Sequence, residues 1–252
     1  ENGKVYRDPG PALQADKALE ILLLELDRLS ANSAPANAIT RVRKTLLNNC
    51  LDAASNNTGL FTLTAPTGSG KTLAMLAFAL QHAVKHKLRR VVMVIPYLTI
   101  TEQTANIYRD LFERHFGPHY VLEHHSLAGL GKENSESDAE REQERQRRLL
   151  SENWDAPIVI TTSVQMLESL FSNRPSSCRK LHRLADSIIL FDEVQTLPLH
   201  LSVPTLAALS HLAHPWRSSV VFSTATQPAF QHLQSQVIPL VETGWQPREI
   251  VS

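Results

Sequence analysis

The chain has 252 residues, 42% of them hydrophobic, which is enough apolar material for one large α/β domain or two small ones. The 25 Lys and Arg residues balance 25 Asp and Glu residues, so no overall basic charge indicates nucleic acid and any such site must be local. Cys50 and Cys178 lie far apart without a C-x-x-C motif, which indicates neither a disulfide framework nor a zinc cluster. The sequence contains no signal peptide and no membrane-length apolar run, so we expect a soluble, cytoplasmic protein.

Hydrophobic periodicity predicts two amphipathic helices, at 12–30 and 39–54, joined by a linker at 30–37. From residue 60 onward, short apolar strands alternate with helices. Strands are expected at 60–64, 91–95, 120–123, 159–161, 187–191, 219–223 and 249–251, and helices at 73–84, 99–116, 164–171, 201–212 and 228–236. This alternation predicts a parallel sheet with helices on both faces, in which ligands bind beyond the carboxyl ends of the strands.

The segment 131–148 departs from this alternation. It holds six acids and five bases and almost nothing apolar. We interpret it as a solvated loop or a charged helix, because its interleaved acids argue against a strong phosphate-binding site.

The stretch APTGSGKT (65–72) predicts a phosphate-binding loop, because it lies between an apolar strand and a helical pattern. Ala65 stands where the pattern G-x-x-x-x-G-K-[ST] has Gly. The glycines let the main chain curl so that its N–H groups point inward, and the following helix directs its positive end to the same place. We expect Lys71 near the β- and γ-phosphates of ATP and the Thr72 hydroxyl on Mg²⁺. The full predicted nucleotide-binding set is Thr67, Gly68, Ser69, Gly70, Lys71 and Thr72.

Two acids follow the strand at 187–191, and small hydroxyl residues follow the strand at 219–223. Asp192 would hold Mg²⁺, and Glu193 would orient and deprotonate the water that attacks the γ-phosphate. Ser223, Thr224 and Thr226 belong to the phrase STAT, and we expect their hydroxyls to couple the state of the acid pair to the nucleic-acid groove.

Polar residues also follow the strands at 91–95 and 159–161. Hydroxyls, amides and helix N-terminal N–H groups suit a phosphate backbone, where position matters more than base identity. For any single residue, the alternative interpretation is ordinary N-capping of the next helix, but the set as a whole favours nucleic-acid contact. The set is Pro96, Thr99, Gln103, Thr161, Thr162 and Gln165.

The histidines do not indicate a metal site. His124 and His125 are adjacent, so their side chains diverge, and no carboxylate cluster is visible nearby in the sequence. Trp154 is expected to be a packing anchor rather than a platform for base stacking.

These motifs resemble the first RecA-like domain of the CRISPR-associated type I helicase–nuclease, a superfamily 2 helicase. The likeness covers about residues 39–230. It rests on FTLTAPTGSGKTLAMLAFALQHA (61–83), VIPYLTITEQTA (94–105), HHS (124–126), NWDAPIVITTSVQMLESLF (153–171), CRKLHRLADSIILFDEVQTLP (178–198) and STATQPA (223–229). The DEVQ-x-LP and NWDAPIV-x-TT phrases distinguish it from DEAD-box RNA helicases and from general DNA helicases.

The resemblance implies an ATP- and Mg²⁺-dependent motor that moves 3′ to 5′ on single-stranded DNA. An RNA-guided CRISPR surveillance complex would recruit it to a displaced strand. The resemblance gives Lys71 and Thr72 the nucleotide and metal roles, Asp192 and Glu193 the acid roles, and Ser223 and Thr226 the coupling role. It also adds His124 and Ser126 to the expected nucleic-acid contacts.

Two features depart from this family. Its nuclease domain uses an adjacent His-Asp pair, and no such dipeptide occurs here. A superfamily 2 motor also closes ATP between two RecA-like domains, and this chain ends soon after STAT. We therefore expect an N-terminal segment at 1–38 and one RecA-like domain at 39–252, without the second RecA-like domain or the HD nuclease domain. Such a piece alone would bind nucleotide weakly and turn it over slowly.

Three other functions stay open at this point. They are another superfamily 2 DNA or RNA helicase, a P-loop ATPase that is not a nucleic-acid motor, and a non-catalytic docking fragment. The lack of an LSGGQ-like signature argues against a transporter ATPase, and the intact loop lysine and acid pair argue against a vestigial site. Gln14 is a candidate for reading adenine, and Arg41 and Arg43 are equally plausible contacts to the nucleotide.

Overall fold

The computed structural model describes residues 10–31, 38–125, 149–225 and 247–251. The charged segment 131–148, the helix predicted at 228–236, and the predicted site residues Ser126 and Thr226 lie outside these residues.

Every helix and strand predicted within the described residues is present, with bounds that differ from expectation by at most three residues at either end. The short helices at 175–178, 181–184 and 194–196 were not predicted. The strands are β1 (Leu60–Thr64), β2 (Arg90–Ile95), β3 (Val121–His124), β4 (Ile158–Thr162), β5 (Ser187–Phe191), β6 (Ser219–Thr224) and β7 (Arg248–Val251). The helices are α1 (Ala15–Ala31), α2 (Ala38–Ala53), α3 (Lys71–His86), α4 (Leu98–Phe116), α6 (Ser163–Phe171), α7 (Pro175–Cys178) and α8 (Leu199–Ala213). Two short 3-10 helices, η1 (Leu181–Leu184) and η2 (Val194–Thr196), flank β5.

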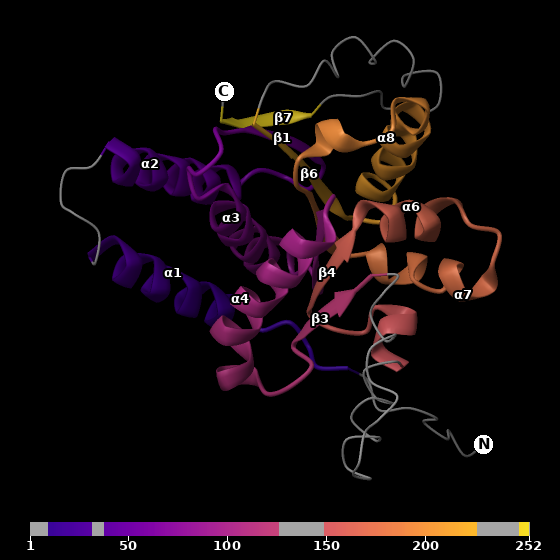
Figure 1. Ribbon diagram of the computed structural model, residues 1–252, viewed down its shortest axis with the longest axis horizontal. Coiled ribbons are helices and arrows are strands. Elements are labelled where there is room, and N and C mark those ends of the chain that lie inside the picture. The colour runs from indigo at the N-terminus through magenta and orange to yellow at the C-terminus, as the bar shows by residue number, and fades with distance from the viewer. Residues whose placement is uncertain (1–9, 32–37, 126–148, 226–246, 252) are drawn as a thin grey trace.

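The seven strands form one parallel sheet in the order β3-β4-β2-β5-β6-β1-β7. Figure 1 shows β7 and β1 near the top of the view and β4 and β3 lower down. Because every pair is parallel, the carboxyl ends of all strands lie at one edge of the sheet. The predicted fold class, a parallel sheet with helices on both faces, is confirmed.

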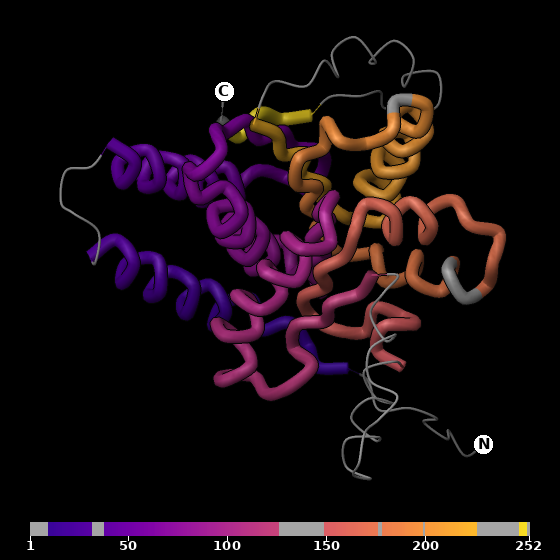
Figure 2. Tube along the Cα trace, viewed as in Figure 1, coloured from indigo at the N-terminus to yellow at the C-terminus, as the bar shows by residue number. Residues whose placement is uncertain are grey.

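Alternate residues of each strand enter two separate hydrophobic cores, as the strand period of two requires. Phe61 and Met93 face a core that includes α1, α2, α3 and α4, whereas Val92 and Phe222 face a core that includes α6 and α8. Figure 2 shows this separation, with the purple N-terminal helices on one side of the sheet and the orange helices on the other. The chain therefore covers both faces of the sheet with its own helices.

Helix α1 belongs to the first of these cores. Its buried residues Leu19 and Leu22 join the cluster that α3 and α4 form over the sheet. The helix predicted at 12–30 thus packs on the helices of the α/β domain, and the predicted boundary at residue 38 stays a prediction. No helix in the described ranges has the length and apolarity that crossing a lipid bilayer requires.

Candidate functional site

The predicted phosphate loop leaves the carboxyl end of β1 and leads directly into α3. Gly68 and Gly70 have φ of 79° and 80°, in the left-handed region where a side chain is strained, so the turn requires glycine at both positions. No side chain caps α3 at Gly70. The first N–H groups of a helix without such a cap are suited to meet an anion.

Lys71, the first residue of α3, meets both predicted acids. Its ammonium lies 2.6 Å from Glu193 Oε1 and 3.2 Å from Asp192 Oδ1. The Lys71 side chain is 7% exposed, so little water screens these charges. Residues more than 120 positions apart in sequence are thus brought together at the sheet edge.

Asp192 and Glu193 end β5 in a defined geometry. The Asp192 Oδ1 accepts hydrogen bonds from the Glu193 main-chain N–H at 3.0 Å and from the Ser223 hydroxyl at 3.4 Å. Glu193 has φ of 48°, a left-handed conformation that costs a non-glycine residue about 1 kcal/mol or more. Such a strained residue at a strand end is typical of a functional site.

The charge state of Glu193 follows from its neighbours. Burial raises the pKa of the Glu193 carboxyl, but the hydrogen bonds from Lys71, Gln195 and the Ala225 main chain, together with the charge of Lys71, bring that pKa below its usual value. Gln195 Nε2 donates to Glu193 Oε2 at 2.5 Å. Gln195 was not among the predicted site residues, although the DEVQ phrase that carries the resemblance contains it.

The end of β6 contacts both the loop and the acids. The Ala65 N–H donates to the Thr224 main-chain oxygen at 3.1 Å, and the Ala225 N–H donates to the Glu193 carboxylate. Together with the Ser223 hydroxyl bond to Asp192, these contacts link the STAT phrase to the phosphate loop. The coupling role of Ser223, Thr224 and Thr226 stays a prediction.

The donor set around Lys71 fits a nucleotide and Mg²⁺. The Asp192 carboxylate and the Thr72 hydroxyl are the hard oxygen ligands that Mg²⁺ prefers. The Ser69 hydroxyl is buried inside the loop and has no hydrogen-bond partner among the described residues. Because buried hydroxyls are nearly always paired, this one is consistent with a loop that a polar ligand completes.

The structure distinguishes two of the three candidates for contact with the nucleotide, Arg43 and Gln14. The Arg43 guanidinium donates to the Gly68 main-chain oxygen, at 3.1 Å from Nη2 and 3.4 Å from Nε. Gln14 instead donates its main-chain N–H to the Tyr120 hydroxyl, at the start of β3 and so at the opposite edge of the sheet. Arg43 therefore lies against the loop, and Gln14 does not reach it.

The residues predicted to bind nucleic acid lie at the carboxyl ends of the adjacent strands β2, β4 and β3. In these strands Ile95 pairs with Thr162, and His124 pairs with Thr161. Thr99 and Gln103 are exposed, and Pro96 is half-buried. Thr161, Thr162 and Gln165 are buried. The Thr161 hydroxyl donates to the His124 main-chain oxygen at 2.7 Å, and the Thr162 hydroxyl caps α6 by accepting from the Gln165 N–H. Thr162 therefore acts as an ordinary helix cap in this structure. Contact with nucleic acid stays a prediction for all six residues.

Trp154 is fully buried, which confirms that it is a packing anchor. Its indole N–H donates to His124 Nδ1 at 3.2 Å, and the Lys180 ammonium lies 5.7 Å from the centre of the ring. Burial and the nearby Lys180 charge lower the pKa of His124 to about 3. His124 is therefore a neutral ring held by Trp154.

The expectation that no carboxylates accompany the histidines was wrong. His125 Nε2 lies 3.0 Å from Glu123 Oε1, and Glu102, Glu123 and His125 bring their polar atoms within 4.8 Å of one another. Arg109 also donates to Glu123 Oε2 at 2.8 Å, so a guanidinium already balances that carboxylate. Glu123 lies two residues before His125 in the sequence, whereas Glu102 comes from the distant helix α4, so spacing alone does not show that the three residues meet.

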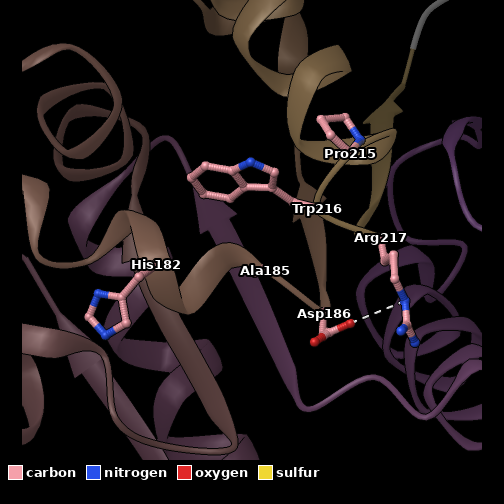
Figure 3. A pocket seen from close by; sticks show the side chains of 6 residues that line it. All are labelled: His182, Ala185, Asp186, Pro215, Trp216 and Arg217. Atoms are coloured by element: carbon pink, nitrogen blue, oxygen red, sulfur yellow. Dashed lines mark ion pairs between the residues drawn. The ribbon is translucent and has the colours of Figure 1, made fainter.

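A shallow hollow of about 430 Å³ lies at the opposite edge of the sheet, at the starts of β5 and β6 (Figure 3). Trp216 and His182 line it, and Arg217 Nε lies 3.4 Å from Asp186 Oδ1. This hollow is separated from the phosphate loop by the length of the strands.

The chain belongs to the DEAD/DEAH box helicase family, whose family model matches residues 40–233. It is similar to the CRISPR-associated nuclease/helicase Cas3 of Haloferax volcanii, with 32% identity over 178 residues. That match covers 66% of this chain and 19% of the relative, so the chain spans about a fifth of the relative's length. Both findings confirm the family resemblance.

Solved structures show the same fold. Cas3 of T. fusca with AMPPNP has a TM-score of 0.61 and 20% identity, over 83% of this chain and 24% of that one. The DUF1998 helicase MrfA bound to DNA has a TM-score of 0.54 and 15% identity, over 97% of this chain and 29% of that one. At these identities the likeness shows the fold alone, which is that of a RecA-like helicase domain.

Proposed function

We propose that this chain is the first ATP-binding domain of a motor that moves on single-stranded DNA in a type I CRISPR effector. The observation that carries the proposal is the meeting of Lys71 with Asp192 and Glu193, beside a glycine loop at the carboxyl edge of the sheet. A lysine for phosphate and two acids with separate roles are the groups that ATP hydrolysis needs. The identity to Cas3 of Haloferax volcanii supports the choice among helicases.

Each residue has a defined role in this proposal. Lys71 and the loop N–H groups hold the β- and γ-phosphates, and Glu193, ionised because its pKa is lowered, accepts the proton of the attacking water. Thr72 and Asp192 would hold Mg²⁺, which neutralises charge on the phosphates when it is bound. Gln195 orients the Glu193 carboxylate through its 2.5 Å hydrogen bond.

The proposal also names partners. A second RecA-like domain would close on the nucleotide and supply arginine fingers, which are worth about 10³ to 10⁵ in rate in related phosphoryl-transfer enzymes. An HD nuclease domain and an RNA-guided surveillance complex would act with it. This chain without the second domain would hydrolyse ATP poorly.

The test is ATP turnover by the complete protein, alone and with single-stranded DNA or single-stranded RNA. Stimulation by DNA alone is the expected result. Stimulation by RNA would favour another superfamily 2 helicase, and turnover that responds to neither would favour an ATPase outside the nucleic-acid motors.

The variant Glu193→Gln tests the roles of the acids in the same assay. We expect turnover to stop, because the proton acceptor is lost. Without magnesium, affinity for an ATP analogue should rise on the order of 10-fold, since Lys71 loses a charged partner that competes with phosphate. Titration of a fluorescent analogue in EDTA measures this rise. Normal turnover, or weaker binding in EDTA, would contradict the assignment.

A further inference from the structure

Tyr108 connects α4 to the nucleotide site. Its side chain is fully buried, and its phenolic oxygen lies 3.5 Å from the main-chain oxygen of Thr72 in the first turn of α3. Burial raises the pKa of the Tyr108 hydroxyl, and the negative charge of Asp192 raises it further. The hydroxyl therefore stays protonated and donates its hydrogen to the Thr72 main-chain oxygen.

The ring of Tyr108 belongs to an aromatic row. Tyr108, Phe112 and Phe116 follow one another at a spacing of four along α4, and Tyr120 completes the row. The ring centres are 6.4, 6.3 and 4.3 Å apart along the row. Hydrophobic packing accounts for the four rings, but a phenylalanine at position 108 would pack equally well. The hydroxyl of Tyr108 therefore needs a separate explanation.

We propose that Tyr108 is a positioning residue that ties the first turn of α3 to α4 and so holds the Thr72 hydroxyl in place relative to Asp192. This inference rests on the proposed function of the nucleotide site. Thr72 and Asp192 are the two residues assigned to Mg²⁺, so a fixed distance between them favours binding of the metal-bound nucleotide. The first two turns of α4 carry Thr99 and Gln103, so a nucleic acid that shifts α4 would shift Thr72 with it.

The test compares Tyr108→Phe with wild type in the complete protein. Affinity for a non-hydrolysable ATP analogue is measured with Mg²⁺ and with EDTA. With Mg²⁺ we expect a loss of about 3- to 10-fold, the range expected for one hydrogen bond, and in EDTA no loss. Stimulation of ATP turnover by single-stranded DNA should fall as well.

Tyr120→Phe is the matched control. Tyr120 is equally buried and ends the same aromatic row, but its hydroxyl accepts the Gln14 N–H at the opposite edge of the sheet. This variant should keep both affinities and the DNA response. Thermal melting of the two variants should agree, because each loses one buried hydroxyl.

The outcomes separate the two proposals. An unchanged response to Mg²⁺ in Tyr108→Phe would overturn the role of Tyr108. A loss of affinity that is equal with Mg²⁺ and with EDTA would also overturn this role. So would an equal loss in the two variants, because either result would indicate a general loosening of the core. Wild type that binds the analogue with Mg²⁺ but ignores DNA would refute the motor function, while the Mg²⁺ comparison still decides the role of Tyr108.

Discussion

Arg43 links the helix before the sheet to the phosphate loop. Its guanidinium holds the Gly68 main-chain oxygen through two N–H groups, and its side-chain stem would contact a Cβ placed on Gly70. A loop that contains two left-handed glycines has many conformations to lose, so a restraint on its main chain favours the conformation that binds phosphate.

Replacing Arg43 with alanine should therefore weaken the binding of an ATP analogue by about 3- to 10-fold. Arg41→Ala is the control, because Arg41 is exposed on the same helix and the described residues show no hydrogen bond or ion pair between it and the loop. It should change the affinity less than about 2-fold. Fluorescence titration measures both, and an equal loss in the two variants would show that only net charge matters.

At the scale of elements, His82 joins three segments of the chain. Its Nδ1 donates to the Ala54 main-chain oxygen at 2.9 Å, just after α2, and its Nε2 accepts from the Ser219 hydroxyl of β6 at 2.8 Å. We assign this tautomer because a carbonyl oxygen only accepts. Burial and the neighbouring charges of His86, Lys85 and Arg248 together lower the pKa of His82 to about 4, although its hydrogen bond to Ala54 opposes this shift.

This histidine should make the fold sensitive to acid. Between its ordinary pKa of about 6.5 and its folded value, the unfolded chain binds a proton that the folded chain does not. The contribution of His82 to the free energy of unfolding is therefore largest above pH 6.5. It decreases as the pH falls toward 4, by up to about 3 kcal/mol in total.

Urea unfolding at pH 7.5 and pH 5.5 measures this loss. His82→Asn, whose amide can still donate to Ala54, should reduce the difference between the two pH values. A smaller slope should remain, because burial also lowers the pKa of His124. An identical pH dependence in the variant and wild type would show that His82 is not the group responsible.

Local sequence patterns predicted the helices and strands, but they could not predict which residues of distant helices and strands contact one another. The strand ends, the glycine loop and the acid pair each depend on neighbouring residues, so their positions follow from spacing and composition. The contact of Arg43 with the loop depends on how α2 packs on α3, which no spacing records. For the same reason the contact of Tyr108 with α3 and the approach of Glu102 to His125 could not be predicted from the sequence. Nor could the burial of Thr162, the residue that caps α6.

At the scale of the whole molecule, α1 is part of the structure that supports the nucleotide site. It packs on α3, the helix that begins with Lys71, and on α4. Leu22 is fully buried in this contact, whereas Leu24, two residues later, is 64% exposed. The two leucines therefore offer a matched pair on one helix.

Leu22→Ala should lower the free energy of unfolding of the complete protein by about 2 to 5 kcal/mol, through lost burial and the cavity that remains. Leu24→Ala should change it by less than about 0.5 kcal/mol. Urea unfolding, followed by a probe in this domain, measures both. A small effect of Leu22→Ala would indicate that the segment before residue 38 folds apart from the sheet, as the predicted boundary at that residue implies.

Lys71 is the shared counter-ion of Asp192 and Glu193, so these three residues carry one positive charge and two negative charges. A ligand that brings only negative charge releases the lysine but leaves two carboxylates without a counter-ion. A ligand that brings both phosphate and a cation supplies a new partner to the lysine and to the carboxylates at the same time. The site should therefore discriminate against sulphate, free phosphate and metal-free nucleotide, and select the nucleotide that arrives with its cation.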